Sequence, residues 1–181
     1  MAHEHYHPVS RFMHWLMAAI FIIAWAIGFY STEFMTYGVD ANKGSVITLH
    51  KNIASTILFL VVIRIFWRYT HPAPKLPNTM SPGMKKLAHF AHYVLYFLLL
   101  AIPITGCIFS WSAGHPVPVL YLFNIPTLLE ENKELVKYAR PVHEYLSLFA
   151  GVVVVGHILA ALKHHFIDKD NVLRSMLKPK K

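Results

Sequence analysis

Residues 141–166 read PVHEYLSLFAGVVVVGHILAALKHHF, and this apolar stretch decides the fold. Its length predicts a membrane-spanning helix with His143 and His157 in its interior. At about 100° and 1.5 Å per residue, both imidazoles leave one face of the helix, about 21 Å apart along its axis. A polar ring is costly in hydrocarbon, so the two histidines indicate functional sites at two depths of the membrane.

Three further apolar runs, at about residues 10–30, 46–69 and 84–111, are long enough to cross a bilayer. The chain is 55% hydrophobic and 14% charged, whereas soluble domains carry about a quarter charged residues. We therefore expect one domain over residues 1–181, an all-α antiparallel four-helix transmembrane bundle. Ser81 and Pro82 are typical of the cap and first turn of the third helix, and Pro141 is expected in the first turn of the fourth. The apolar segment 116–126 is expected to cap one face, and residues 172–177 to form amphipathic turns.

The formal net charge of +8 does not indicate nucleic-acid binding, because the cations lie beside the apolar runs, as in membrane proteins. Five lie on one side of the predicted topology: Lys43, Lys51, Lys133, Lys137 and Arg140. Twelve lie on the other: Arg11, Arg64, Arg68, Lys75, Lys85, Lys86, Lys163, Lys169, Arg174, Lys178, Lys180 and Lys181. Cytoplasmic loops carry the excess, so both termini are expected in the cytoplasm.

With this topology, four histidines can be matched by depth. His14 and His157 lie near the inner surface, and His50 and His143 near the outer one. Haem is the cofactor whose iron takes axial histidines, so the two pairs predict two b haems between the helices. Filling both axial positions favours electron transfer over oxygen binding. The alternatives are hydrogen-bonded packing of each histidine and a zinc site, although zinc requires its ligands close together. The single cysteine, Cys107, excludes covalent haem attachment through two cysteines.

A second group of basic residues lies near the inner surface. These residues either extend to the lipid interface or bind the propionates of a haem and the headgroup of a quinone. Histidine suits proton-coupled reduction because its pKa is near neutral. The group consists of Arg64, Arg68, His89, His92, Lys163, His164 and His165. The candidates for haem propionates are Arg64, Lys51 and Arg140, the last two lying beside the outer histidines.

Several motifs resemble the bacterial cytochrome b561 family over nearly the whole chain: HWL at His14, LHK at His50, VIRIFWR ending at Arg68, LAHFAHY with His89 and His92, VHEYL at His143, and GHILAALKHHFIDKD with His157 and His164. The resemblance implies a four-helix bundle in the bacterial inner membrane with two b haems. Its axial ligands would be His14, His50, His143 and His157. It also implies electron exchange with ubiquinone. One branch is similar to a superoxide oxidase, whose quinone-side histidines correspond to His89 and His164. Together with the neighbouring Arg68, these two histidines are the candidates for a quinone site.

The leading interpretation is a di-haem electron carrier in the lipid bilayer, between an outer-side donor, such as a periplasmic protein, and the quinone pool. One alternative is a superoxide:ubiquinone oxidoreductase. Another is the cytochrome b anchor subunit of a periplasmic dehydrogenase. The outer segments carry the five cations above and six acids, so we expect weak steering of the superoxide anion. The acids are Glu33, Asp40, Glu130, Glu131, Glu134 and Glu144.

Overall fold

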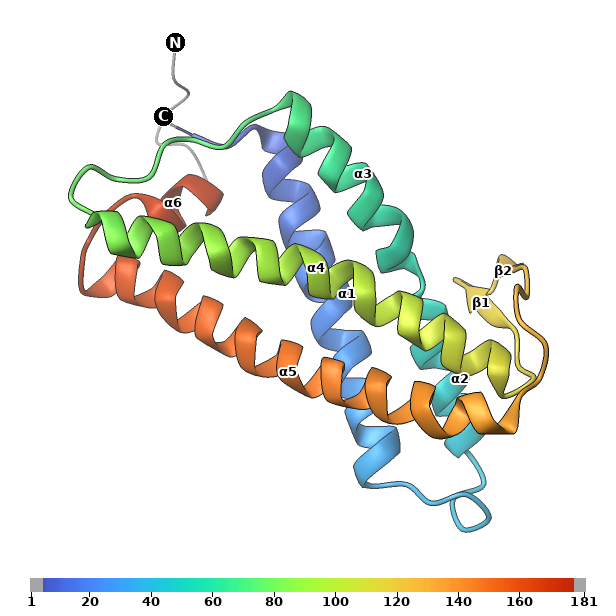
Figure 1. Ribbon diagram of the computed structural model, residues 1–181. Coiled ribbons are helices and arrows are strands. Elements are labelled where there is room, and N and C mark those ends of the chain that lie inside the picture. The colour runs from blue at the N-terminus through green and yellow to red at the C-terminus, as the bar shows by residue number, and fades with distance from the viewer. Residues whose placement is uncertain (1–4, 178–181) are drawn as a thin grey trace.

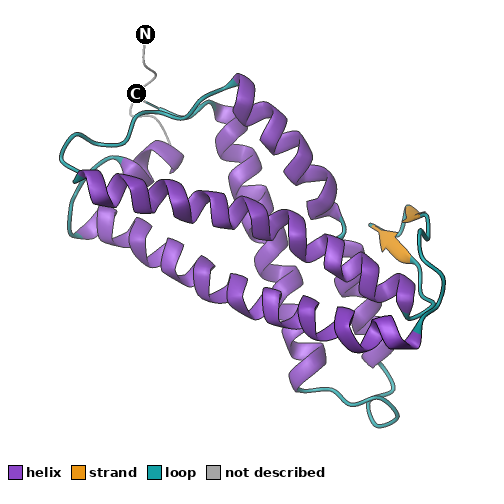
Figure 2. Cartoon of the chain, viewed as in Figure 1, coloured by secondary structure: helices purple, strands orange, loops and turns teal. Residues whose placement is uncertain are grey.

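Long apolar helices make up almost the whole protein in the computed structural model, which describes residues 5–177 (Figure 1). Four stretches are long and apolar enough to cross a membrane. They are α1 (Pro8–Glu33), the pair α2 (Lys43–Ala54) and α3 (Thr56–Thr70), α4 (Pro82–Ser112) and α5 (Lys133–Phe166). The remaining elements are β1 (Val117–Val119), β2 (Phe123–Ile125) and α6 (Val172–Leu177). The predicted all-α, multi-pass membrane architecture is confirmed (Figure 2).

The helices form two neighbouring groups. α4 and α5 lie side by side along their length, and α1 packs against α2 and α3 (Figure 1). The groups meet where Met17 of α1 and Ile57 and Val61 of α3 are buried against Leu99 and Leu100 of α4. Large apolar side chains elsewhere face outward, as a helix in lipid requires.

The second membrane span is broken at Ser55, where the sequence predicts one helix over residues 46–69. The Ser55 hydroxyl donates to the carbonyl oxygen of Pro118, 2.8 Å away. The Thr56 hydroxyl donates to the carbonyl oxygen of Ile53 at 2.7 Å. The Thr56 bond reaches a carbonyl three residues back, a pattern that bends helices, and the Ser55 bond ties the break to β1.

The fourth span begins at Lys133, so the expected start at Pro141 was wrong. Asn132 caps the helix, because its side-chain oxygen accepts from the backbone N–H groups of Glu134 and Leu135. Residues of high helix propensity occupy positions 133–140, and the helix continues through Pro141. By contrast, Ser81 caps α4 with Pro82 in its first turn, as predicted.

The predicted interfacial segment at 116–126 is a two-stranded antiparallel hairpin, β1–β2, against α2. Its turn residues Leu120 and Tyr121 have φ values of 49° and 58°, the left-handed conformation of a tight hairpin turn. Asn52 of α2, buried at 1% exposure, accepts at its side-chain oxygen from the Tyr121 N–H at 2.5 Å. The hairpin is therefore fixed to the part of α2 that carries His50.

The C-terminal residues 172–177 form α6, the predicted short helix, which returns to the first turns of α1. The indole of Trp15 donates to the carbonyl oxygen of Met176 at 2.9 Å. Arg11 donates to the carbonyl oxygen of Leu177 at 3.3 Å. These bonds join α6 to the end of the protein where α1 begins and α5 ends.

Candidate functional site

The four histidines that were predicted as ligands form two facing pairs. Each pair combines the two histidines that were expected at the same depth in the membrane. The rings of His14 on α1 and His157 on α5 have centres 6.2 Å apart. Those of His50 on α2 and His143 on α5 have centres 6.3 Å apart. The ring planes are inclined by 71° and 75°, respectively. α5 thus supplies one histidine to each end of the bundle, and a different helix supplies each partner.

Backbone carbonyls orient both rings of the His50–His143 pair. His50 Nδ1 lies 2.8 Å from the carbonyl oxygen of Ala24, and His143 Nδ1 lies 3.1 Å from that of Ile102. A carbonyl oxygen only accepts, so each Nδ1 carries the hydrogen and each Nε2 keeps a free lone pair. This is the arrangement that prepares histidine to bind a metal.

Two glycines make room for these rings. A Cβ on Gly28 of α1 would lie 2.9 Å from His50 Cε1, and a Cβ on Gly106 of α4 would lie 3.0 Å from His143 Cε1. Any side chain at either position would therefore push an imidazole aside. Sequence reasoning missed both glycines, because nothing in their spacing links them to histidines on other helices.

An arginine lies beside the His14–His157 pair. Arg64 Nη2 is 3.4 Å from His14 Nδ1, and Arg64 Nε donates to the Tyr96 hydroxyl at 3.1 Å. Arg64 Nη1 is buried and has no hydrogen-bond partner among residues 5–177. His92 of α4 also reaches this end, with its ring centre 5.6 Å from that of His157. Arg64 and His92 thus lie beside the pair, and Nη1 of Arg64 is a hydrogen-bond donor without an acceptor.

The other two propionate candidates have partners already. Lys51 donates to the Ser110 hydroxyl at 2.8 Å. Arg140 forms an exposed ion pair with Glu144 at 2.8 Å. Of the three candidates, Arg64 is the one that presents a buried donor without an acceptor.

The three quinone-site candidates do not converge. Arg68 and His89 line one pocket of about 530 Å³ between the end of α3, the following loop and the start of α4. His164 is not among its lining residues. Instead, His164 Nδ1 lies 2.7 Å from a carboxylate oxygen of Asp170 and 3.2 Å from one of Asp168.

Comparison with known proteins decides the family. A family model described as prokaryotic cytochrome b561 matches residues 5–179, almost the whole chain. The chain belongs to the prokaryotic cytochrome b561 family. Membership confirms the resemblance drawn from the histidine motifs, and it implies haem b in a membrane cytochrome.

Named relatives within the cytochrome b561 family cover most of the chain. Cytochrome b561 homolog 2 of Escherichia coli (strain K12) is 35% identical over 174 residues, which cover 96% of this chain and 92% of the relative. Probable superoxide oxidase CybB of Yersinia pestis is 31% identical over 179 residues, which cover 99% and 98%, respectively. Cytochrome b561 homolog 1 of Escherichia coli (strain K12) is 26% identical over 132 residues, covering 73% and 74%.

Proposed function

We propose that this cytochrome b561 protein holds two b haems and passes electrons between a donor at its His50–His143 end and ubiquinone at its His14–His157 end. The observation that carries the proposal is the presence of two facing histidine pairs at two levels of α5. Each pair draws its histidines from two helices, so each site requires the assembled bundle.

The dimensions of the pairs support haem as their ligand. Two imidazole nitrogens that each bound one metal ion at about 2 Å would place their ring centres about 6 Å apart. The observed ring separations of 6.2 and 6.3 Å match this value. The unpartnered Nη1 of Arg64 would donate to a propionate oxygen beside His14 and His157.

Haem b supplies a reversible one-electron couple at its iron when bound. The residues of the chain decide how that couple is used. Two facing histidines would hold the group from both sides at each site and leave no room for a small ligand, so the group would serve electron transfer. The carbonyls of Ala24 and Ile102 fix the direction of the His50 and His143 rings.

Haem content tests the proposal directly. We expect about two haems per chain in the purified protein, and about one after His143→Ala or His157→Ala. The two variants should lose haems that differ in absorption spectrum and reduction potential, because His143 and His157 belong to different pairs. His115→Ala is the control, since His115 is exposed and belongs to neither pair. A wild-type ratio near one would contradict the di-haem assignment.

We further propose that both termini face the cytoplasm of a bacterial inner membrane. Arg11, Arg64, Lys85, Lys163 and the other described cations of the majority group lie where α1 and α4 begin and α3 and α5 end. Lys178, Lys180 and Lys181 fall outside the described residues. A positive excess at one end of a bundle favours its cytoplasmic placement.

The quinone site is proposed at this same end, where Arg68 and His89 line the pocket and His164 lies against Asp170. A histidine that can donate and regain a proton suits reduction of a quinone to a quinol. We expect His89→Ala and His164→Ala to slow quinone reduction about tenfold or more, with both haems retained. His115→Ala, at the opposite end, is the control. Full turnover in both variants would remove these histidines from the quinone site.

Superoxide oxidation is a second candidate function, favoured by the relative from Yersinia pestis that is named a probable superoxide oxidase. In that reaction superoxide loses one electron and becomes dioxygen, and two such electrons with two protons reduce one quinone to the quinol. The test is whether the purified protein alone reduces ubiquinone when supplied with superoxide. An anchor subunit of a dehydrogenase would require its partner instead.

A further inference from the structure

The pocket between α3 and α4 is strongly basic. Its charged lining consists of Arg68, Lys75 and Lys85, to which His89 and the amide of Asn78 add polar groups. No aspartate or glutamate lines the pocket. Within residues 5–177, none of the three cations forms a salt bridge. The pocket therefore concentrates positive charge that no carboxylate of the described chain balances.

The cations enter the pocket from different segments. Arg68 lies in the last turns of α3, Lys85 in the first turn of α4, and Lys75 in the loop between them. This loop connects two membrane spans, so the pocket opens at the level where a membrane surface meets water.

Exposed apolar side chains lie close in sequence to the residues that line the pocket. Tyr69 is 87% exposed and Phe66 is 71% exposed on α3. Leu87 and Phe90 are also exposed on α4, on either side of His89 in sequence. Exposed apolar side chains on a membrane span lie against acyl chains. A ligand that enters the pocket from the membrane would thus meet apolar surface first and cations at the interface.

We propose that this pocket also binds the phosphate headgroup of an anionic phospholipid, with Lys75 and Lys85 contacting the phosphate, Arg68 and His89 left to the quinone, and the acyl chains lying along α3 and α4. Basic pockets between membrane helices bind such headgroups. The proposal goes beyond the electron-transfer function. It depends on two lysines that no step of quinone reduction uses.

The charge distinguishes this ligand from a quinone. A quinone headgroup is neutral and needs one or two hydrogen-bond donors, which Arg68 and His89 already provide. It gives no partner to Lys75 and Lys85. A phosphate diester carries a full negative charge with several acceptor oxygens, so it satisfies cations that would otherwise remain unpaired.

Lipid binding can be measured on the haem-loaded full-length protein in neutral detergent by native mass spectrometry. Three probes separate the sources of phosphate: phosphatidylglycerol, phosphatidylcholine and inorganic phosphate. We expect one phosphatidylglycerol to bind about tenfold more tightly than phosphatidylcholine. Inorganic phosphate at equal concentration should leave the phosphatidylglycerol complex intact. Displacement by inorganic phosphate, or equal binding of the two lipids, would overturn the proposal.

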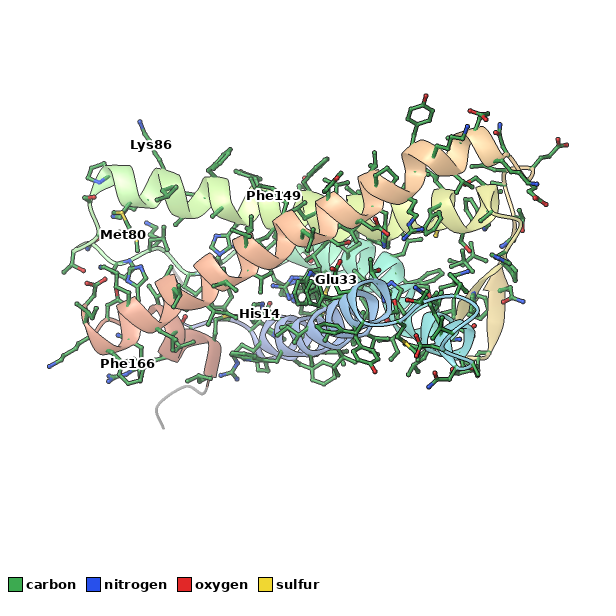
Figure 3. All side chains as sticks on the ribbon, turned by 90° about the horizontal axis from the view of Figure 1, so that it is seen from below. His14, Glu33, Met80, Lys86, Phe149 and Phe166 are labelled. Atoms are coloured by element: carbon green, nitrogen blue, oxygen red, sulfur yellow. The ribbon has the colours of Figure 1, made fainter. Side chains whose placement is uncertain are left out.

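Neighbouring lysines provide a matched pair of variants. Lys85 lines the pocket, whereas Lys86 is exposed and points away from the helices (Figure 3). Lys85→Gln and Lys75→Gln should each weaken phosphatidylglycerol binding about fivefold, and Lys86→Gln should leave it unchanged. Equal losses in Lys85→Gln and Lys86→Gln would show that only overall charge attracts the lipid. The measurement detects the mass of the bound lipid, so its result does not depend on whether the quinone proposal is correct.

Discussion

The indole of Trp25 on α1 donates to the carbonyl oxygen of Ser147 on α5 at 2.8 Å. The same ring lies over Gly151, where a Cβ would come within 2.9 Å of Trp25 Cζ2. Ser147 and Gly151 lie between His143 and His157 in α5. Trp25 thus joins the two helix groups at a level between the proposed haem sites.

Gly151→Ala should destabilise the protein. The added methyl group meets a large ring that is held by a hydrogen bond, and overpacking of this kind costs about 1–3 kcal/mol. Gly156→Ala is the matched control on the same helix, since a Cβ there has nothing within 4 Å. The loss of the haem absorption band on heating measures the stability of both variants. A transition temperature for Gly151→Ala at or above that of Gly156→Ala would show that the Trp25 ring can shift without loss of stability.

Gly106→Ala should affect the His50–His143 site alone. A Cβ at Gly106 would lie 3.0 Å from His143 Cε1, and a ring bound to a metal cannot move away without losing that bond. We expect haem content to fall from about two toward one, with the His14–His157 component unchanged. Gly83→Ala is the control in the same helix, because a Cβ there meets open space. Retention of both haems in Gly106→Ala would mean that α4 shifts to accommodate the methyl group.

Hydropathy was sufficient to predict the four spans. The pairing of the histidines then followed from their depths, because successive spans cross the membrane in opposite directions. The break at Ser55 could not be predicted in this way. The Ser55 hydroxyl at the break bonds to Pro118, far away in sequence, and no local pattern indicates that contact. The hairpin was missed because Leu120 and Tyr121 occupy left-handed turn positions that glycine or asparagine usually fill.

The arrangement of the quinone-site candidates could likewise be predicted only in part from the sequence. His164 was grouped with Arg68 and His89 because all three lie near one membrane surface. Depth does not specify position around the bundle, and the acid that binds His164 follows the end of α5. The sequence therefore predicted the level of these residues but not which of them share the pocket.

Arg64→Gln should lower the reduction potential of the haem proposed at the His14–His157 pair. A buried cation stabilises the reduced, more negative state, so its removal favours the oxidised state by on the order of tens of millivolts. Arg140→Gln removes the same charge from an exposed ion pair with Glu144, and it should change neither potential appreciably. Redox titration followed by absorption spectroscopy resolves the two haems. Equal shifts in the two variants would place Arg64 outside the propionate site.

A reporter fused after Lys181 should show activity typical of the cytoplasm. The expectation follows from the concentration of cations where α1 and α4 begin and α5 ends. Paired fusions of an enzyme active only in the periplasm and a protein fluorescent only in the cytoplasm provide the measurement. A fusion within the loop that joins α1 and α2 serves as the opposite control. Periplasmic activity at the C-terminus would reverse the orientation and leave the histidine pairs as they are.

Superoxide should reduce the protein only modestly fast, with weak dependence on salt. Electrostatic steering needs free positive charge around the entrance, and it can raise association rates by about 10- to 10³-fold. At the His50–His143 end, Lys137 pairs with Glu134 at 2.7 Å and Arg140 with Glu144 at 2.8 Å. Lys43 is buried and donates to the carbonyl oxygen of Met35 at 2.7 Å. With two of the five outer cations in ion pairs and six acids in the same segments, little net positive charge remains to attract an anion.

Stopped-flow measurement of haem reduction by superoxide at low and high salt tests this expectation. Glu144→Gln provides the sharpest variant, because it frees Arg140 from its ion pair three residues from His143. Reduction by superoxide should then become faster at low salt, and the gain should disappear as salt screens the freed charge. In the wild type, a rate near the diffusion limit that falls steeply with salt would show that a positive entrance exists despite these ion pairs. Superoxide oxidation would then replace transfer from a protein donor as the better account of this end of the molecule.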